Sequence, residues 1–294
     1  MVPTRPSHLP LSDKQDDMLR SEIDDIASDA GAENVAVGFY DYETSTSWSY
    51  RGSEWFHAAS TIKVALLAGV FRAIEEGRYD EENRLHVRNR FLSAVEGEPF
   101  RVASGRDADS EVHSRRGKTM PIGELAHHMI TTSSNLATNL LLNLVGAEFV
   151  RETLDEMDVE GLDFQRGVED EKAFEAGVNN RATADGLVAL FRRIYEREVL
   201  SEDICDEMMG ILYQQHFNSG IPAGLGEPDE GEVRVAHKTG EISTVAHDAG
   251  VVTWPEREPY VLAVLTEWER GNTGHRQDTL ANVSSAIFKH LIRE

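Results

Sequence analysis

The chain has 294 residues, with 29 Lys and Arg against 52 Asp and Glu, which gives a formal net charge of −23. Its composition, 40% hydrophobic and 28% charged, is that of a globular protein with one large domain or two lobes. The charge argues against a general nucleic-acid binder, because such a protein needs a basic face that displaces counterions from phosphates.

The basic residues are unevenly chosen. Six are lysine (Lys14, Lys63, Lys118, Lys172, Lys238 and Lys289), so 23 of the 29 are arginine. An acidic surface that is poor in lysine is typical of a salt-adapted protein, since salt screens the repulsion between like charges. We expect such an adaptation, with an ordinary acidic protein as the alternative.

The single cysteine, Cys205, excludes an intramolecular disulfide and a Cys-rich metal site, and its apolar neighbours predict a buried, inert thiol. The first 19 residues hold no apolar segment of the kind found in signal peptides, and no run approaches 18 apolar residues. These features predict a cytoplasmic protein that has no membrane partner. We also expect a monomer.

The first third of the chain begins with a helical pattern over residues 12–30, which Gly31 ends. Two strand-like runs follow at 35–42 and 46–51, joined by a short polar turn. From Ser60 to Ile74 the chain is apolar on nearly every side, which predicts a buried helix that ends at Gly77. Residues 84–118 are interpreted as loop with short helices.

The rest of the chain is helical in its middle and strand-like near its end. Helices are predicted from Pro121 through two segments to Gly146, then at 147–157, 183–197, 201–215 and 276–292. Strands are predicted at 233–240, 249–254 and 260–268. Because strands cluster at both chain ends, we expect an α+β fold of two lobes: a sheet built from both ends with flanking helices, and an inserted all-helical lobe.

This order also suggests domain boundaries. We expect an N-terminal extension and helix over 1–30, a single catalytic domain over 31–270 and a C-terminal helix within 271–294 that packs on the sheet. Within this frame, the sheet lobe is assigned to about 31–56 and 218–294, and the helical lobe to about 57–217.

Three short motifs carry the chemistry. Ser60 and Lys63 form S-x-x-K at the start of the buried helix, Ser133-Ser134-Asn135 lies at a helix boundary, and Lys238-Thr239-Gly240 follows a strand. Each is weak alone. In this order and context they form the set used by active-site serine enzymes that open β-lactams or attack peptidoglycan peptides.

Three other motifs with known chemistry were sought in the sequence, and none of them is complete. Gly117-Lys118-Thr119 resembles the end of a phosphate-binding loop, but Val112 stands where that loop needs its first glycine. There is no H-E-x-x-H, and the adjacent His127 and His128 point in different directions on a helix. A G-x-S-x-G elbow is also missing. We therefore expect neither a metal nor a cofactor.

The spacing of Ser60 and Lys63 suits nucleophilic catalysis. Residues three apart share one face of a helix, so the amine can reach the serine Oγ. Burial disfavours the ammonium form and lowers the pKa of the lysine, which can then take the serine proton. The alternative, a capping serine followed by an exposed lysine, does not explain a lysine within so apolar a helix.

These motifs and the stretch MITTSSNLATNLLLNLVGA at 129–147 resemble the class A serine β-lactamases over roughly residues 30–270. The resemblance implies the fold of serine β-lactamases and DD-peptidases, with an antiparallel sheet. The family's second motif is usually S-D-N, and its acid has a structural part. Here Ser134 stands in place of that acid.

The resemblance also implies roles for individual residues. Ser60 would be the nucleophile, Lys63 its base, and Ser133 would pass a proton to the leaving nitrogen. Asn135 would hold the substrate amide and Lys63, while Lys238 and Thr239 of the Lys-Thr-Gly240 motif would engage the substrate carboxylate. The backbone N–H groups of Ser60 and Glu241 would form the oxyanion hole.

The deacylating carboxylate is expected in the loop at 163–180. Glu169 lies close to the position that the family's spacing gives and is our candidate for the base that activates water, although Ala173 stands where the family usually has an asparagine four residues later. Glu175, which has Asn179 four residues later, and a merely solvated acidic loop are the alternatives. Arg166 is interpreted either as an ion-pair anchor for this loop or as a surface charge. His247 and Asp248, placed in the turn after the third motif, are expected to be structural and to orient a neighbouring strand, with a contact to substrate as the alternative.

The sequence thus predicts a serine hydrolase of class A β-lactamase type that acts on a small-molecule amide or ester. One alternative is a related esterase, amidase or peptidase with little antibiotic turnover. The other is a penicillin-binding or sensor protein that stays acylated. The enzyme needs a carboxylate that can activate water for deacylation, and the sensor lacks one. The assignment of Glu169 therefore decides between the two.

Overall fold

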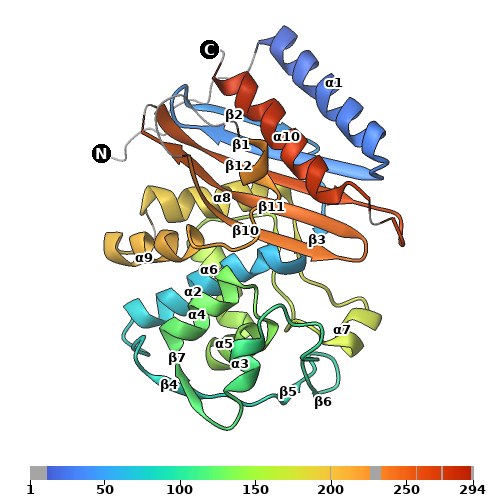
Figure 1. Cartoon of the computed structure of the whole chain (residues 1–294). Helices are drawn as coiled ribbons and strands as arrows, with labels where there is room; N and C mark the ends of the chain where they lie inside the picture. The colour runs from blue at the N-terminus through green and yellow to red at the C-terminus, as the bar shows by residue number, and fades with distance from the viewer. Residues whose placement is uncertain (1–11, 199, 226–232, 256, 273, 293–294) are drawn as a thin grey trace.

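A computed structural model describes residues 12–198, 200–225, 233–255, 257–272 and 274–292. The sheet is built from both ends of the chain, as expected (Figure 1). It has five strands: β1 (Asn34–Asp41), β2 (Thr46–Tyr50), β10 (Arg234–Ile242), β11 (Val245–Trp254) and β12 (Arg257–Glu267). Their order is β10-β11-β12-β1-β2, and every neighbouring pair is antiparallel. Strand β10 therefore lies at an edge.

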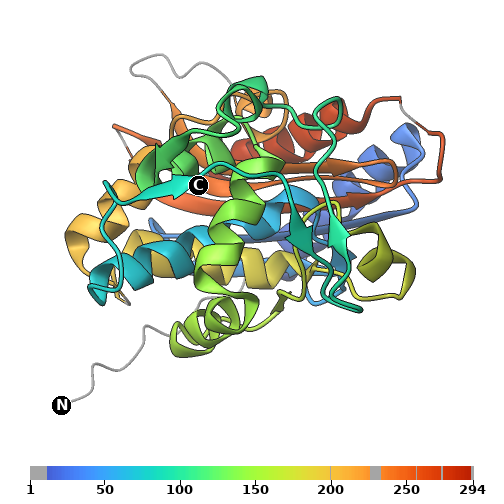
Figure 2. The same ribbon diagram turned by 90° about the horizontal axis from the view of Figure 1, so that it is seen from below.

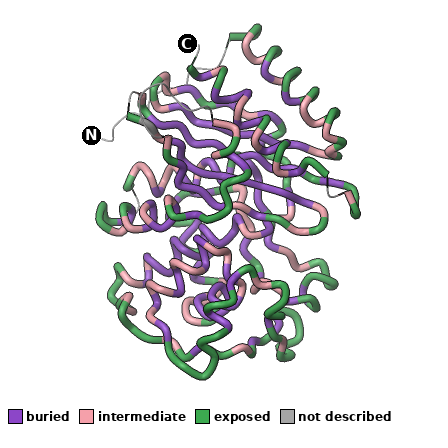
Figure 3. The backbone as a smooth tube through the Cα atoms, viewed as in Figure 1, coloured by how far each residue is buried: buried purple, intermediate pink, exposed green. Residues whose placement is uncertain are grey.

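Alternation along the strands gives the sheet two apolar faces. In β1, Val35, Val37 and Phe39 pack with the helices α1 (Asp13–Ala30) and α10 (Arg276–Leu291). Ala36 and Tyr40 point the other way, into the larger core. That core includes α8 (Ala184–Glu196), which contacts β1, β11 and β12. Figure 3 shows the buried backbone concentrated in the sheet and in the helices directly beneath it.

The helical lobe surrounds α2 (Lys63–Glu75), which the sequence predicts as a buried helix. Ten of its 13 residues are buried. It packs against α4 (Ile122–Thr131), α5 (Asn135–Val145), α6 (Ala147–Glu156) and α9 (Glu202–Leu212). Figures 1 and 2 place α2 centrally, between the sheet and the outer helices. The two-lobed α+β fold is thus confirmed.

Short elements complete the chain. They are the 3-10 helices η1 (Ala59–Ile62) and η2 (Ile221–Gly224), the helices α3 (Ser110–Ser114) and α7 (Glu171–Glu175), and the strands β3 (Phe56–His57), β4 (Arg84–His86), β5 (Phe91–Leu92), β6 (Pro99–Phe100), β7 (Thr119–Pro121), β8 (Leu162–Asp163) and β9 (Arg181–Ala182). The segment 84–118 therefore holds three short strands as well as a helix. Our loop interpretation missed them, since two or three residues carry no periodicity.

Other expectations meet the structure in part. Cys205 is buried, and burial raises the pKa of its thiol, as an inert cysteine requires. In the described part of the chain, no helix is both long enough and apolar enough to cross a bilayer. The first 11 residues, on which the signal-peptide expectation partly rests, lie outside the described residues. The domain boundaries at about 57 and 217 remain a prediction.

Candidate active site

Ser60 lies in the 3-10 turn η1, which runs directly into α2 at Lys63. The residue before it, Ala59, has a φ of 47°, a left-handed conformation that is unfavourable for a residue with a Cβ. Strand β10 packs closely on this turn. A Cβ on Gly240 would stand 2.9 Å from the backbone nitrogen of Ser60, so the third motif needs glycine here.

The Lys63 amine is fully buried and points to the second motif. It donates hydrogen bonds to Ser133 O (2.7 Å), Ser133 Oγ (3.1 Å) and Asn135 Oδ1 (2.8 Å). These three bonds use all three amine protons, and among the described residues none goes to Ser60 Oγ. The expected direct contact with Ser60 is thus replaced here by a contact with Ser133.

Burial lowers the pKa of Lys63 to about 7, while the carboxylates of Asp107 and Glu169 act in the opposite direction. An amine with such a pKa is partly a free base near neutral pH. It can therefore accept a proton directly, or through the Ser133 hydroxyl that it already contacts.

Glu169 lies on the far side of Asn135 from Lys63. Asn135 Nδ2 donates to Glu169 Oε1 at 2.9 Å, and the backbone N–H of Ala103 donates to Oε2 at the same distance. The Arg106 guanidinium is 3.5 Å from Oε2, and the Glu169 side chain is 11% exposed. The side chain is thus held in place but remains open to water.

The loop that carries Glu169 is anchored by Arg166. This arginine is buried and donates hydrogen bonds to Gly167 O, Val178 O and Asn179 Oδ1. Among the described residues its bonds go to carbonyl oxygens and to no carboxylate, so it is neither the ion-pair anchor nor the surface charge that we expected. Asn179 therefore pairs with Arg166, and Glu175 is exposed on the short helix α7.

The third motif runs along the free edge of β10. Lys238 is fully buried, its Nζ donates to Thr239 O at 2.9 Å, and burial lowers its pKa, with a smaller contribution from the charge of Lys63. The cavity next to it is lined by Thr239 and Glu241 instead. Because β10 is an edge strand, part of its backbone is left for a ligand rather than for another strand.

Two hollows meet at Ser60. One, of about 400 Å³, lies between the second and third motifs and is lined by Ser60, Arg106, Ala108, Ser133, Asn135, Phe217, Ser219, Thr239, Glu241 and Gln277. The other, of about 580 Å³, extends from Ser60 along the loop that carries Glu169. All three motifs and the candidate carboxylate thus surround one concave site of the size that small molecules occupy.

A sequence model of the β-lactamase enzyme family matches residues 18–291. The chain belongs to the β-lactamase enzyme family. Together with the buried lysine and the serine in the cavity, this makes the protein a serine β-lactamase-like hydrolase.

Solved structures agree with this β-lactamase fold. PBP-A shares 26% identity with this chain at a TM-score of 0.82, and the match covers 99% of this chain and 100% of PBP-A. A mutant of PBP-A, solved as an acyl-enzyme complex with penicillin G, matches at 26% identity and a TM-score of 0.81, over 98% and 100% of the chains. A class A β-lactamase from Mycobacterium abscessus matches at 21% identity and a TM-score of 0.79, over 93% and 99% of the chains.

In this member of the β-lactamase family, an acidic residue from outside the second motif, Asp107, lies next to that motif. Ser134 is fully buried, and its hydroxyl is 3.5 Å from Asp107 Oδ2. Sequence reasoning missed Asp107. The available signal was the acidic pair Asp107 and Asp109 in a loop of a chain whose second motif lacks its acid.

The third motif is backed by two residues that we placed wrongly. His247 and Asp248 lie within strand β11, paired with Gly240 and Thr239, because β11 begins at Val245 and the turn is shorter than expected. His247 bonds to the carbonyl of His57, and Asp248 bonds to the ring of His237. Both are buried, and these contacts fit the structural role that we expected.

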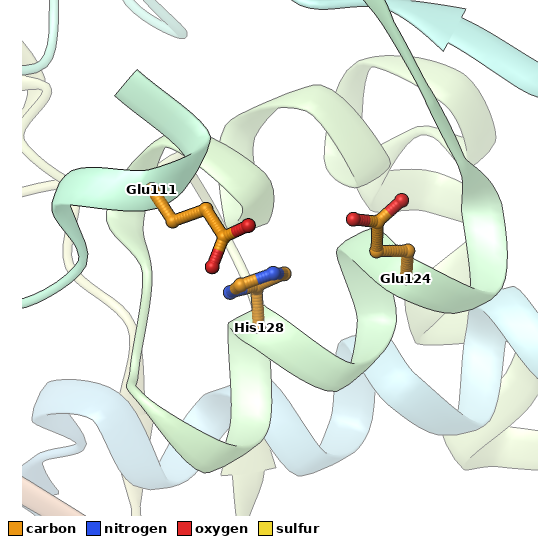
Figure 4. A group of neighbouring side chains, drawn as sticks. All are labelled: Glu111, Glu124 and His128. Carbon is orange, nitrogen blue, oxygen red and sulfur yellow. The ribbon is translucent and has the colours of Figure 1, made fainter. Parts of the chain in front are cut away.

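One group of side chains outside the site has the composition of a metal site. Glu111, Glu124 and His128 place one potential ligand atom each within 4.8 Å of the others (Figure 4). However, Glu111 is exposed and pairs with Arg115, and His128 Nδ1 bonds to Asp109. Exposed acids of this kind are common without an ion, so we assign no metal to this group, and the expected metal-free reaction stays a prediction.

Proposed function

We propose that this protein is a serine hydrolase of class A β-lactamase type, which opens β-lactam amides through an acyl-enzyme on Ser60 and releases the product by hydrolysis. The observation that carries the proposal is the link through Asn135. Its side chain joins the Lys63 amine to the Glu169 carboxylate beside the Ser60 cavity. A base for acylation and a base for deacylation thus flank one nucleophile.

Acylation begins when Ser60 Oγ attacks the lactam carbonyl carbon. The serine proton passes to the Lys63 amine, and the Ser133 hydroxyl delivers its proton to the leaving nitrogen as the C–N bond breaks, while Lys63 returns a proton to Ser133. We propose that the N–H groups of Ser60 and Glu241 stabilise the oxyanion. Asn135 would hold the substrate amide, while the Lys238 and Thr239 side of the cavity would receive the substrate carboxylate.

Deacylation needs an activated water. We propose that Glu169 takes a proton from a water molecule, which attacks the ester carbon. The ester C–O bond then breaks, and the proton that Glu169 took from water passes to Ser60 Oγ, which restores both groups. The 11% exposure of the Glu169 side chain supports this step, because the carboxylate must meet both water and the acyl group.

A second candidate function is a penicillin-binding protein that is acylated and stays so. The likeness to PBP-A, at 26% identity over nearly the whole chain, supports it. It differs from the first proposal only in the fate of the acyl-enzyme.

One experiment tests both candidates. Purified protein is mixed with a chromogenic β-lactam, and product release is followed while mass spectrometry locates any adduct. Steady turnover after a burst supports the hydrolase, and a single stoichiometric burst supports the penicillin-binding protein. Ser60→Ala is the control and should form no adduct. An adduct that persists in Ser60→Ala would exclude both candidates.

A further inference from the structure

Asp107 lies in the segment between β6 and α3, outside all three motifs, yet it bonds to the start of helix α5. We propose that Asp107 is a positioning residue, which from a neighbouring segment holds the second motif in the way that the acid missing at Ser134 would. The proposal rests on the proposed function only for the statement that the second motif takes part in catalysis.

The contacts of Asp107 are those of a carboxylate that fixes a backbone. Its side chain is completely buried. Oδ1 accepts the N–H of Asn135 at 3.1 Å, and Oδ2 accepts the N–H of Leu136 at 2.9 Å. These are the first two residues of α5, whose N–H groups have no partner within the helix and favour a negative charge.

The remaining bonds tie this carboxylate to its surroundings. Oδ1 also accepts the N–H of Asp109, and Oδ2 bonds to the His113 ring at 3.0 Å and lies 3.5 Å from Ser134 Oγ. The position of Ser134 next to this carboxylate matters most. A carboxylate at position 134 would lie against the carboxylate of Asp107. Because two buried like charges repel each other, an ionised acid is favourable at only one of the two positions.

A single residue, Asn135, connects Asp107 to the groups that react. The Asn135 backbone is fixed by Asp107, and the Asn135 side chain bonds to both Lys63 and Glu169. Displacement of this residue would therefore disturb the acylating and deacylating bases together. Small shifts of this kind cost catalysis on the order of 10²-fold.

Asp107 also contributes charge. The charged groups that act on the Lys63 amine are Asp107, Glu169 and the buried Lys238, and Asp107 is the stronger of the two acids in holding up the pKa of Lys63. An aspartate that only held the backbone of α5, too far from Lys63 for its charge to act on the amine, would not alter the titration of Lys63. This difference makes the role of Asp107 measurable without any substrate.

The first experiment follows the titration of Lys63 by NMR. The chain has six lysines, so selective labelling of the lysine Cε carbons gives a simple spectrum, in which Lys63→Arg identifies the Lys63 signal. The wild-type midpoint should lie at about 7. Asp107→Asn should lower it. Asp41→Asn, which removes another fully buried aspartate, in the Arg257 pair of the sheet, should not.

The second experiment moves the acid back into the motif. Asp107→Ser and Ser134→Asp should each lower the melting temperature, the first through loss of the carboxylate and the second through two carboxylates in contact. The combined variant should regain a melting temperature within about 2 °C of wild type, together with the wild-type Lys63 midpoint. Single effects that simply add in the combined variant would overturn the proposal, as would an unchanged Lys63 midpoint in Asp107→Asn.

Acylation then connects Asp107 to function. If wild type is acylated by a β-lactam, Asp107→Ser should slow acylation on the order of 10²-fold, and Ser134→Asp in the same chain should restore it. Lack of restoration, with a normal melting temperature, contradicts the positioning role. If wild type is not acylated at all, the proposed function fails, but the titration and melting experiments still decide the role of Asp107.

Discussion

Asn135 Nδ2 donates a hydrogen bond of 2.9 Å to Glu169 Oε1. An amide nitrogen is a donor only, so this contact fixes the orientation of the Asn135 amide and turns its oxygen toward the Lys63 amine. The loop carboxylate and the second motif therefore form one hydrogen-bonded unit rather than two separate sites. The predictions on Glu169 and Lys63 below follow from this unit.

Glu169→Gln should separate the two half-reactions. The substitution keeps the shape of the side chain but removes the base, so acylation at Ser60 should continue while deacylation falls by roughly 10²–10⁴-fold. Mass spectrometry should show a long-lived adduct after a single burst. Glu175→Gln, at an exposed position, serves as the control and should turn over like wild type. Equal turnover in Glu169→Gln and wild type would remove Glu169 from the mechanism and make Glu175 the next candidate.

The rate of acylation should depend on pH through Lys63. Its free amine is the form that accepts the serine proton, and burial lowers its pKa to about 7. Below this pH the amine is protonated and inactive, so the rate should rise as pH increases through about 7 and then level off. Pre-steady-state acylation rates across this range provide the measurement. Lys63→Arg, which cannot lose its proton, should be slow at every pH.

Salt should stabilise the protein. With a net charge of −23, repulsion is long-ranged at low ionic strength, and the Debye length falls from about 10 Å at 0.1 M to about 3 Å at 1 M salt. The melting temperature should therefore rise between these concentrations of KCl. A flat or falling curve would favour the ordinary acidic protein over the salt-adapted one.

Glu241 should disfavour anionic substrates. Its side chain lies at the cavity beside Thr239, where we place the substrate carboxylate, and it accepts a hydrogen bond from Gln277. Two like charges about 4 Å apart in water repel by about 1 kcal/mol, or about fivefold in rate. Glu241→Gln should raise kcat/KM for a carboxylate-bearing β-lactam by about this factor at low salt, and less at 1 M KCl. A neutral substrate should show no change.

Much of this architecture could be predicted from the sequence. The apolar stretch after Ser60 fixes a buried helix, and the long β-branched runs near the C-terminus fix strands, so both lobes follow from local pattern. The residues Ser60, Lys63 and Lys238 were found as parts of the S-x-x-K and Lys-Thr-Gly motifs, and Lys63 stood out further because a buried lysine requires a reason. Glu169 was found by spacing alone.

The rest depended on contacts that local pattern does not contain. Asp107 contacts Asn135 from 28 residues away in the chain. A local hydrophobic pattern cannot predict a contact between residues so far apart in the sequence. Two of the three partners of Arg166 are backbone carbonyls, which every residue has, so these contacts leave no trace in the sequence. His247 was misplaced because the turn before β11 is only as long as the gap between Ile242 and Val245.

The left-handed backbone at Ala59 and Ser133 links the stability of the fold to the rate of its reaction. Such conformations cost about 1–3 kcal/mol each in a residue with a side chain, and here they occur beside the nucleophile and at the second motif. Glycine at Ala59 would relieve the cost but also loosen the turn that aims Ser60. Glycine at these positions should therefore favour the stability of the fold and disfavour turnover.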